Sequence, residues 1–258
     1  IRGKKGTKVR LKIRHADANK EEVLSIIRAK VVLSDREAHG EVLEVKQDKG
    51  KDPLRVGVVV LPSFYMDMAA AGRGVKDFKS TTRDVARILA GFEKGKGIDA
   101  VVVDLRINGG GALSEAIALT GLFIDTGPVV QIKQLRGRVD TRADKDSGVV
   151  WAGPLVVLTS KFSASASEVF AGAIRDHGRA LLIGTTTFGK GSVNNLWPLD
   201  DGSGLYFTIA RWFTPSGVQI EGDGINPNII QENPDDASED VQLDRAIEIL
   251  EQLLAQVN

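Results

Sequence analysis

The chain has 258 residues, enough for one large domain or two small ones, and its 42% hydrophobic and 26% charged content is typical of a folded globular protein. Its 34 Lys and Arg residues balance 34 Asp and Glu residues, and a net charge of zero argues against a dedicated nucleic-acid binder. Cysteine is absent, which excludes disulfides, thiolate metal sites and a cysteine nucleophile, and no apolar run reaches the ~18 residues that span a membrane.

The first residues predict a turn followed by a single strand. Apolar and basic residues alternate from Val9 to Arg14, which is the pattern of an amphipathic strand. A strand needs partners, and little sequence upstream could supply them, so we interpret residues 1–14 as the end of a module whose body is missing. No signal peptide is visible at the start. Residues 15–55 are mostly polar and charged.

From residue 55 onward, apolar strands alternate with amphipathic or buried helices, which implies a layered α/β core. Strands are predicted at residues 55–61, 99–105, 128–133, 154–159, 180–183, 193–198 and 205–213. Helices are predicted at residues 80–94, 112–124, 165–177 and 238–257, an irregular surface segment at 63–79 and a charged loop at 136–148.

A glycine-rich turn follows the predicted strand at residues 99–105. Asn108 is followed by Gly109, Gly110 and Gly111, and a helix begins directly afterwards. Glycine allows positive φ angles and a close approach of main-chain N–H groups to a ligand, and such donors suit a developing negative charge. The alternative is an ordinary tight turn between a strand and a helix.

Serines stand at the start of the predicted helix at residues 165–177. A serine at such a strand-to-helix turn can be a nucleophile, and the next N–H can complete an oxyanion hole. Ser165 and Glu168 also have the spacing of a capping box, so Ser165 can instead be a helix cap.

None of the three histidines is well placed to activate Ser165. His15 and His39 lie in the polar N-terminal stretch, and His177 is twelve residues beyond Ser165, or ~18 Å away on a single helix. Asp176 fails the same test at ~16 Å. A Ser-His-Asp triad is therefore disfavoured, and His177 and Asp176 are expected to close the helix.

A lysine lies in the glycine-rich segment that starts at Gly184. The pattern G-x-x-x-x-G-K approaches a phosphate-binding loop, but Gly191 replaces the required Ser or Thr, and a strand follows instead of a helix. The preferred interpretation is that glycines hold Lys190 beside Phe188, where apolar packing disfavours the ammonium form and makes the amine a general base. The alternative is an exposed loop lysine. Together these segments indicate a serine nucleophile, a lysine base and a main-chain oxyanion hole.

Nearly the whole chain resembles the C-terminal processing, or tail-specific, serine proteases. The resemblance is densest at residues 104–111, 154–168, 187–193 and 224–229. It implies that Ser165 is the nucleophile and that Lys190, 25 residues on, is the base. It also implies oxyanion donors at Ala166 and at a glycine of the turn, Gly110 or Gly111, and it places Asn194 where the family usually has a glutamine that orients the lysine.

The same resemblance implies a crotonase-like fold built from stacked ββα units and a PDZ module that captures the C-terminus of the substrate. Residues 1–14 would be the last strand of that PDZ module, and residues 15–258 the protease domain with its C-terminal helix. The implied activity is endopeptidase cleavage of proteins near disordered, apolar C-terminal tails, outside the cytoplasm, in bacterial periplasm or plastid lumen. No cofactor, metal or nucleic-acid partner is expected.

Two other interpretations remain open. The chain could be a non-catalytic peptide-binding relative with the same fold, which the replacement of the family's glutamine by Asn194 favours. It could also be a crotonase-type acyl-CoA enzyme, although no feature of the sequence indicates a CoA pocket.

Overall fold

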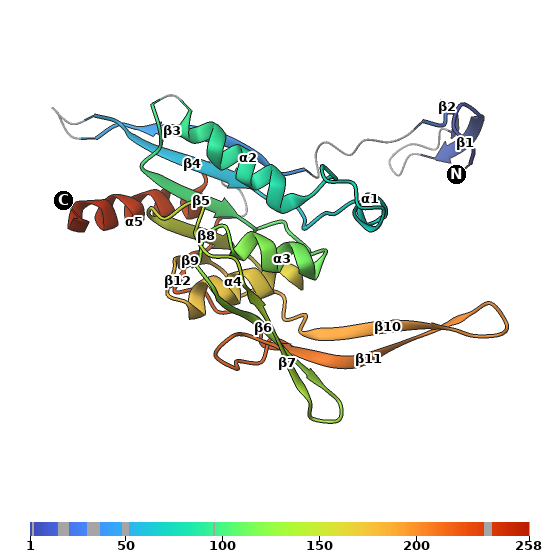
Figure 1. The fold of residues 1–258 in the computed structure, drawn as a ribbon. Coiled ribbons are helices and arrows are strands. Elements are labelled where there is room, and N and C mark those ends of the chain that lie inside the picture. The colour runs from blue at the N-terminus through green and yellow to red at the C-terminus, as the bar shows by residue number, and fades with distance from the viewer. Residues whose placement is uncertain are drawn as a thin grey trace. The chain divides into compact units, whose positions relative to one another are not determined.

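The computed structural model describes residues 1, 3–14, 21–29, 37–47, 52–94, 96–234 and 239–257, and Figure 1 shows their arrangement. The chain divides into two compact units, Ile1–Asp35 and Arg36–Asn258. The expected boundary after Arg14 therefore differs from the observed one by about twenty residues, because a second strand belongs to the first unit.

The first unit is a two-stranded antiparallel hairpin of β1 (Lys8–Arg14) and β2 (Glu21–Ile27). The predicted strand is confirmed, but its partner follows it in the sequence instead of preceding it. Four apolar side chains of β2 are exposed: Val23, Leu24, Ile26 and Ile27. Because a lone hairpin is marginally stable in water, these side chains need a covering surface.

A six-stranded mixed sheet forms the centre of the second unit, with the strand order β12-β9-β8-β5-β4-β3. All neighbours are parallel except β3, which pairs antiparallel with β4. The strands are β3 (His39–Val45), β4 (Leu54–Val60), β5 (Ala100–Asp104), β8 (Leu155–Thr159), β9 (Leu181–Gly184) and β12 (Ile229–Ile230).

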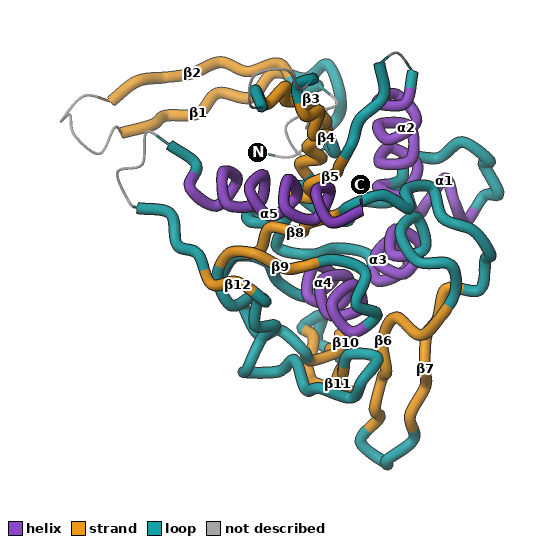
Figure 2. The backbone as a smooth tube through the Cα atoms, turned by 90° about the vertical axis from the view of Figure 1, so that its left-hand side faces the viewer, coloured by secondary structure: helices purple, strands orange, loops and turns teal. Residues whose placement is uncertain are grey.

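Helices cover both faces of this sheet, as the two views of Figures 1 and 2 show. Alternate residues of a strand point to opposite faces. On β5, Val101 and Val103 pack in a core with residues of α2, α3 and α4, whereas Ala100 and Val102 pack in a core with α5. The helices are α2 (Thr81–Glu93), α3 (Leu113–Thr120), α4 (Ala166–Asp176) and α5 (Val241–Val257).

A second, antiparallel sheet has the strand order β10-β11-β6-β7 and projects from the α/β body in Figure 1. Its strands are β6 (Gly127–Gln134), β7 (Val139–Asp144), β10 (Ser192–Pro198) and β11 (Gly204–Phe213). The strand β10 forms one edge of this sheet and begins two residues after Lys190.

The α/β class is confirmed, and three local expectations are wrong. The strands β2 and β3 arise in the polar N-terminal stretch, and β7 replaces part of the loop expected at 136–148. The segment 63–79, expected to be irregular, contains α1 (Met68–Gly72), and Phe64 forms a parallel bridge with Gly111. In the described ranges, every helix is too short or too polar to cross a lipid bilayer.

Candidate active site

Ser165 stands at a sharp turn between β8 and α4. Its backbone has φ 59° and ψ −114°, and it is the only non-glycine residue with positive φ in the described part of the chain. Such a conformation is strained and persists only where the surrounding structure enforces it, which is common at active sites. A strained strand-to-helix turn is also the geometry that exposes nucleophilic serines in other folds.

The other serines of residues 160–167 hold the local structure together. Their hydroxyls donate to main-chain carbonyl oxygens: Ser160 to Arg106, Ser163 to Leu105 (2.8 Å) and Ser167 to Asn108 (2.8 Å). Among the described residues, no acceptor is recorded for the Ser165 hydroxyl proton. Ser165 is therefore the serine of this segment that remains free to donate its proton to a base.

A buried glutamate, Glu168, joins the serine turn to the lysine loop. Its side chain is inaccessible to solvent and accepts four hydrogen bonds. Oε1 accepts from Thr187 Oγ1 (2.6 Å) and Gly189 N (2.6 Å), and Oε2 accepts from Ser165 N (2.8 Å) and Lys190 N (2.8 Å). Four donors, two on each oxygen, compensate the cost of burying the carboxylate.

This carboxylate brings Ser165 and Lys190 together. Since both main-chain nitrogens bind the same oxygen at 2.8 Å, they lie within about 6 Å of each other. The loop needs glycine on both sides of Lys190: Gly189 has φ +88°, and a Cβ on Gly191 would overlap the main chain of Glu221. Phe188, which was expected to pack beside Lys190, is 64% exposed, so little of its side chain is available for the expected apolar packing.

The glycine turn packs directly against Ser165. Gly110 has φ +101°, and a Cβ added to it would lie 2.8 Å from Ser165 Cβ and 3.1 Å from Ala166 N. Asn108, which is fully buried, holds this turn: its side chain donates to Leu61 O (2.7 Å) and accepts from Gly110 N (2.9 Å). Only glycine permits this close approach of two main chains.

Of the three expected oxyanion donors, one N–H has an acceptor among the described residues, and the other two have none recorded there. The Gly110 N–H is already donated to Asn108 Oδ1. In the bridge to Phe64, Gly110 O accepts from Phe64 N and Ala112 N donates to Phe64 O, so the Gly111 N–H points away from Phe64. Ala166 is the first residue of α4, so its N–H has no partner inside the helix.

The remaining predicted residues lie away from the serine. The side chain of Asn194 accepts a hydrogen bond from Thr208 Oγ1 (2.8 Å), across the β10–β11 pair. His177 ends α4, and its Nε2 lies 2.8 Å from Pro128 O. His39 begins β3, and His15 lies outside the described residues.

Asp176 has the structural role that the sequence indicated. It is the last residue of α4, and its Oδ2 accepts from Ser216 N (2.9 Å). Burial alone would raise the pKa of Asp176, but hydrogen bonds from Ser216, Thr214 and Arg175 outweigh that effect and hold the pKa below its ordinary value. The aspartate thus fixes the end of the helix to the turn after β11.

A second ionic cluster lies at the carboxyl end of β5. Arg106 donates to both oxygens of Asp104 and to both oxygens of Asp240, at 2.6 to 3.1 Å. Burial would lower the pKa of Arg106, but the two carboxylates reverse that effect and raise it. This cluster ties the residues before α5 to the strand that leads into the glycine turn.

Sequence reasoning missed the two residues that organise the site. Glu168 was recognised only as half of a capping box, although a glutamate beside buried Val169 and Phe170 is a signal that the helix start is not exposed. Asn108 was seen only as the start of the glycine turn. Their partners come from segments far away in the sequence, which local patterns do not report.

Residues 55–231 match the family model described as peptidase family S41. The chain belongs to peptidase family S41. It is 38% identical over 237 residues to a tail-specific protease of Haemophilus influenzae and 34% identical over 237 residues to the carboxy-terminal processing protease CtpA of Bacillus subtilis. These alignments cover 89% and 91% of this chain but 31% and 45% of the S41 relatives, so the chain spans less than half of their lengths.

Solved structures agree with this S41 assignment. The photosystem II D1 C-terminal processing protease is 28% identical and superposes with a TM-score of 0.65, covering 93% of this chain and 59% of that one. A putative S41 protease from Bacteroides fragilis gives a TM-score of 0.62 over 95% of this chain and 67% of that one, and at 17% identity it shows a shared fold only.

Proposed function

We propose that this chain is the catalytic part of a serine endopeptidase that cleaves proteins near apolar, disordered C-terminal tails. The observation that carries the proposal is the carboxylate oxygen of Glu168 that holds the main chains of Ser165 and Lys190 together. The strained φ of Ser165 supports its assignment as the nucleophile. The names of the S41 relatives support the reaction class and the C-terminal site of cleavage.

In the proposed mechanism, Ser165 Oγ attacks the scissile carbonyl carbon while the neutral amine of Lys190 accepts the hydroxyl proton. A bound substrate that removes water from the amine favours its neutral form. As the tetrahedral intermediate collapses, Lys190 donates that proton to the leaving amine. Water then attacks the acyl-enzyme, with Lys190 again acting as the base, and Ser165 is released.

The oxyanion is assigned to the N–H groups of Ala166 and Gly111. Ala166 N is the free first donor of α4, where the helix dipole also favours negative charge. Gly110 is the weaker of the two glycine candidates, because its N–H is donated to Asn108. Asn194 Oδ1 already accepts from Thr208, and its second lone pair is the one that could accept from the lysine.

We further propose that an extended substrate adds as a strand to the free edge of β10. This edge follows directly after Lys190, and an edge strand offers unpaired N–H and C=O groups to a peptide. Leu196 and Trp197 on β10 are 61% and 60% exposed, which suits an apolar tail.

The crotonase-like fold, the location outside the cytoplasm and the PDZ origin of the first unit are also proposals. The resemblance supports a crotonase-like arrangement of the α/β unit and a location in the bacterial periplasm or another compartment outside the cytoplasm. It also supports a PDZ origin for the first unit, Ile1–Asp35, whereas the sequence alone indicated residues 1–14. The exposed apolar side chains of β2 support that origin, because the body of such a module would cover them.

A non-catalytic peptide-binding relative is the second candidate. The hydrogen bond from Thr208 to Asn194 favours it, since it holds the Asn194 side chain against β11. The Ser165 hydroxyl takes part in the capping box of α4, but its proton has no acceptor among the described residues. This proton and the buried link to the lysine loop argue against a binding role, because peptide binding alone requires neither.

Cleavage of a protein that carries a disordered apolar C-terminal tail tests the proposal. Removing either member of the pair, by Ser165→Ala or Lys190→Ala, should reduce kcat by about 10³-fold or more. The matched controls Ser147→Ala and Lys145→Ala change exposed residues beyond β7 and should retain full activity. Unchanged cleavage by Ser165→Ala or by Lys190→Ala would show that the assignment is wrong.

A further inference from the structure

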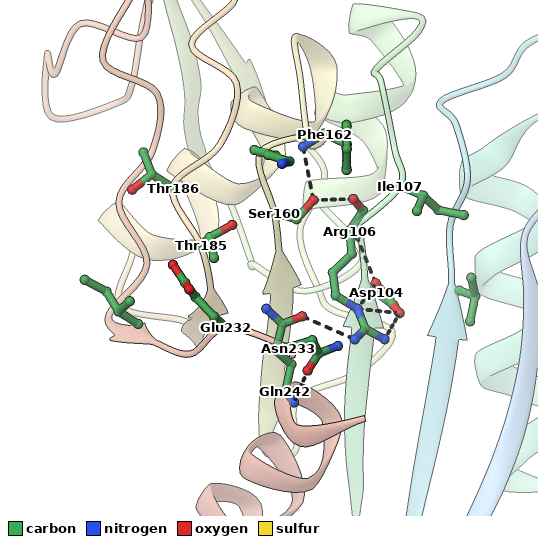
Figure 3. Close-up of a pocket in the computed structure, with 13 residues that line it drawn as sticks. Asp104, Arg106, Ile107, Ser160, Phe162, Thr185, Thr186, Glu232, Asn233 and Gln242 are labelled. Atoms are coloured by element: carbon green, nitrogen blue, oxygen red, sulfur yellow. Dashed lines mark hydrogen bonds and ion pairs between the residues drawn. The ribbon is translucent and has the colours of Figure 1, made fainter. Parts of the chain in front are cut away.

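A cleft of about 1110 Å³ lies at the carboxyl ends of the parallel strands, and none of the functions assigned so far uses it. Its walls come from the segments that follow β5, β8, β9 and β12 and from the start of α5. In open α/β sheets, ligands bind in crevices outside the carboxyl ends of the strands. Figure 3 shows Phe162 and Ile107 at one end of the cleft and Gln242 at the other.

The floor of the cleft presents no unpaired charge. Arg106 binds Asp104 and Asp240, so this cluster of one guanidinium and two carboxylates carries one net negative charge, and Arg106 Nη1 also lies 3.3 Å from Gln242 Oε1. Gln242 Nε2 donates to the Gln231 carbonyl at 2.7 Å. An acidic ligand would therefore be repelled, and a basic one would lose its own hydration against carboxylates that already bind Arg106.

The rim is apolar and electrically balanced. Ile107, Phe162 and Ile230 are 67%, 60% and 75% exposed, although all three line the cleft. Lys161 and Glu232 are the remaining charged residues of the lining, and their opposite charges offset each other. Exposed apolar side chains around a concave surface mark a binding site for an apolar partner.

Two lining residues of the cleft lie close in sequence to the serine turn and the glycine turn. Phe162 is three residues from Ser165, and Ile107 is three residues from Gly110, so each pair of Cα atoms is at most about 11 Å apart. An extended peptide advances about 3.3 Å per residue. A polypeptide held at Ser165 therefore reaches the rim three or four residues from the scissile bond.

We propose that this cleft binds an extended, uncharged and apolar stretch of the substrate polypeptide, three or four residues from the bond that is cleaved. This inference rests on the proposed peptidase function and adds a subsite that selects for apolar sequence. The occupant is a segment of the substrate itself, because the residues that form the rim also lead into the serine and glycine turns.

Peptides of graded length test the subsite. A fixed apolar cleavage sequence is extended by alanine and leucine residues, from one to six on each side of the scissile bond, and kcat/KM is measured for each. In the wild type, kcat/KM should rise when the extension on one side passes four residues. Ile230→Asp should reduce this rise about tenfold, which is the change expected from losing one buried side-chain contact. Leu135→Asp is the matched control, since Leu135 is 77% exposed and lies between β6 and β7.

Charge in the extension gives a second readout. Lys161→Glu replaces the rim's positive charge by a second negative charge beside that of Glu232, so a lysine placed four residues from the scissile bond should become preferred over an aspartate by several-fold. An unchanged preference in Lys161→Glu would show that the cleft does not hold substrate. The same conclusion would follow if Ile230→Asp and Leu135→Asp reduced the length-dependent rise in kcat/KM equally.

Binding separates this inference from the peptidase proposal. The affinity of the Ser165→Ala chain for a fluorescent six-residue-extended peptide is measured by anisotropy, with and without Ile230→Asp. A loss of affinity of about tenfold on adding Ile230→Asp supports the cleft even if the wild type cleaves nothing. Equal affinity overturns the cleft even if Ser165 and Lys190 prove catalytic.

Discussion

Replacement of Glu168 by glutamine tests whether one buried carboxylate organises the site. The side chain accepts from four donors, two on each oxygen. An amide of the same shape has one acceptor oxygen and one NH₂ group. If the NH₂ group replaces Oε2, the N–H groups of Ser165 and Lys190 face another donor; if it replaces Oε1, the Gly189 N–H does, because the Thr187 hydroxyl can also accept.

The expected cost follows from those lost contacts. A hydrogen bond to a charged group contributes about 1.5–3 kcal/mol, so the loss of one or two in Glu168→Gln should lower the free energy of unfolding by roughly 1.5–6 kcal/mol. A domain is typically stable by about 5–15 kcal/mol, so the variant should still fold. If the two main chains separate by about 1 Å, activity should fall on the order of 100-fold.

Urea unfolding measures the stability, and kcat/KM on the tailed substrate measures the activity. Glu221→Gln is the control, because Glu221 accepts from Gly191 N alone and glutamine can keep that bond. Its cost should be about 1 kcal/mol or less. If Glu168→Gln is no less stable and no less active than Glu221→Gln, the reasoning from four shared donors is refuted.

Three further predictions follow from the same geometry. Gly110→Ala should lower kcat/KM by at least about 100-fold, because its methyl group would press on Ser165, whereas Gly109→Ala enters open space and should stay active. Thr187→Val should lose activity and Thr187→Ser retain it, since only the hydroxyl bridges Glu168 and Ile225; equal activities would contradict this. Burial alone would raise the pKa of Asp240, but hydrogen bonds outweigh burial and hold the pKa below its ordinary value. The ionised carboxylate therefore stabilises the fold above about pH 4, and this stabilisation is lost as the pH falls further. The stability difference between wild type and Asp240→Asn should therefore shrink on acidification in chemical unfolding, and a constant difference would contradict it.

Apolar runs made the centre of the fold predictable. The strands β4, β5 and β8 are buried on both faces, so their valines and leucines form continuous runs bounded by polar or turn residues. The helix α2 has one apolar stripe, and Ser80 caps it. Burial produces these patterns directly, so they predict these three strands and this helix correctly.

Two edge strands, β3 and β7, escaped prediction because pairing, and not burial, defines them. The strand β7 carries Asp140, Arg142 and Asp144, and its main chain is ordered by β6. The strand β3 borders the main sheet and is held by β4. Charged residues at sheet edges prevent aggregation, and the same charges hide the strand from a hydrophobic pattern.

The residue types and spacing of the proposed catalytic pair can be read from the sequence, but its geometry cannot. Spacing and residue type singled out Ser165 and Lys190, but the positive φ of Ser165 and the contacts of Glu168 depend on segments that meet only in the fold. The free N–H of Gly111, in contrast to that of Gly110, likewise depends on the side chain of Asn108 and on the bridge to Phe64.

Mass spectrometry of the chain after treatment with a fluorophosphonate is the most direct test of whether Ser165 is activated by Lys190. One adduct should form, on the peptide that contains Ser165, and it should be lost in Ser165→Ala and strongly slowed in Lys190→Ala. An adduct on Ser160, Ser163 or Ser167, or labelling of Ser165 at the same rate without Lys190, would contradict the assignment of this pair.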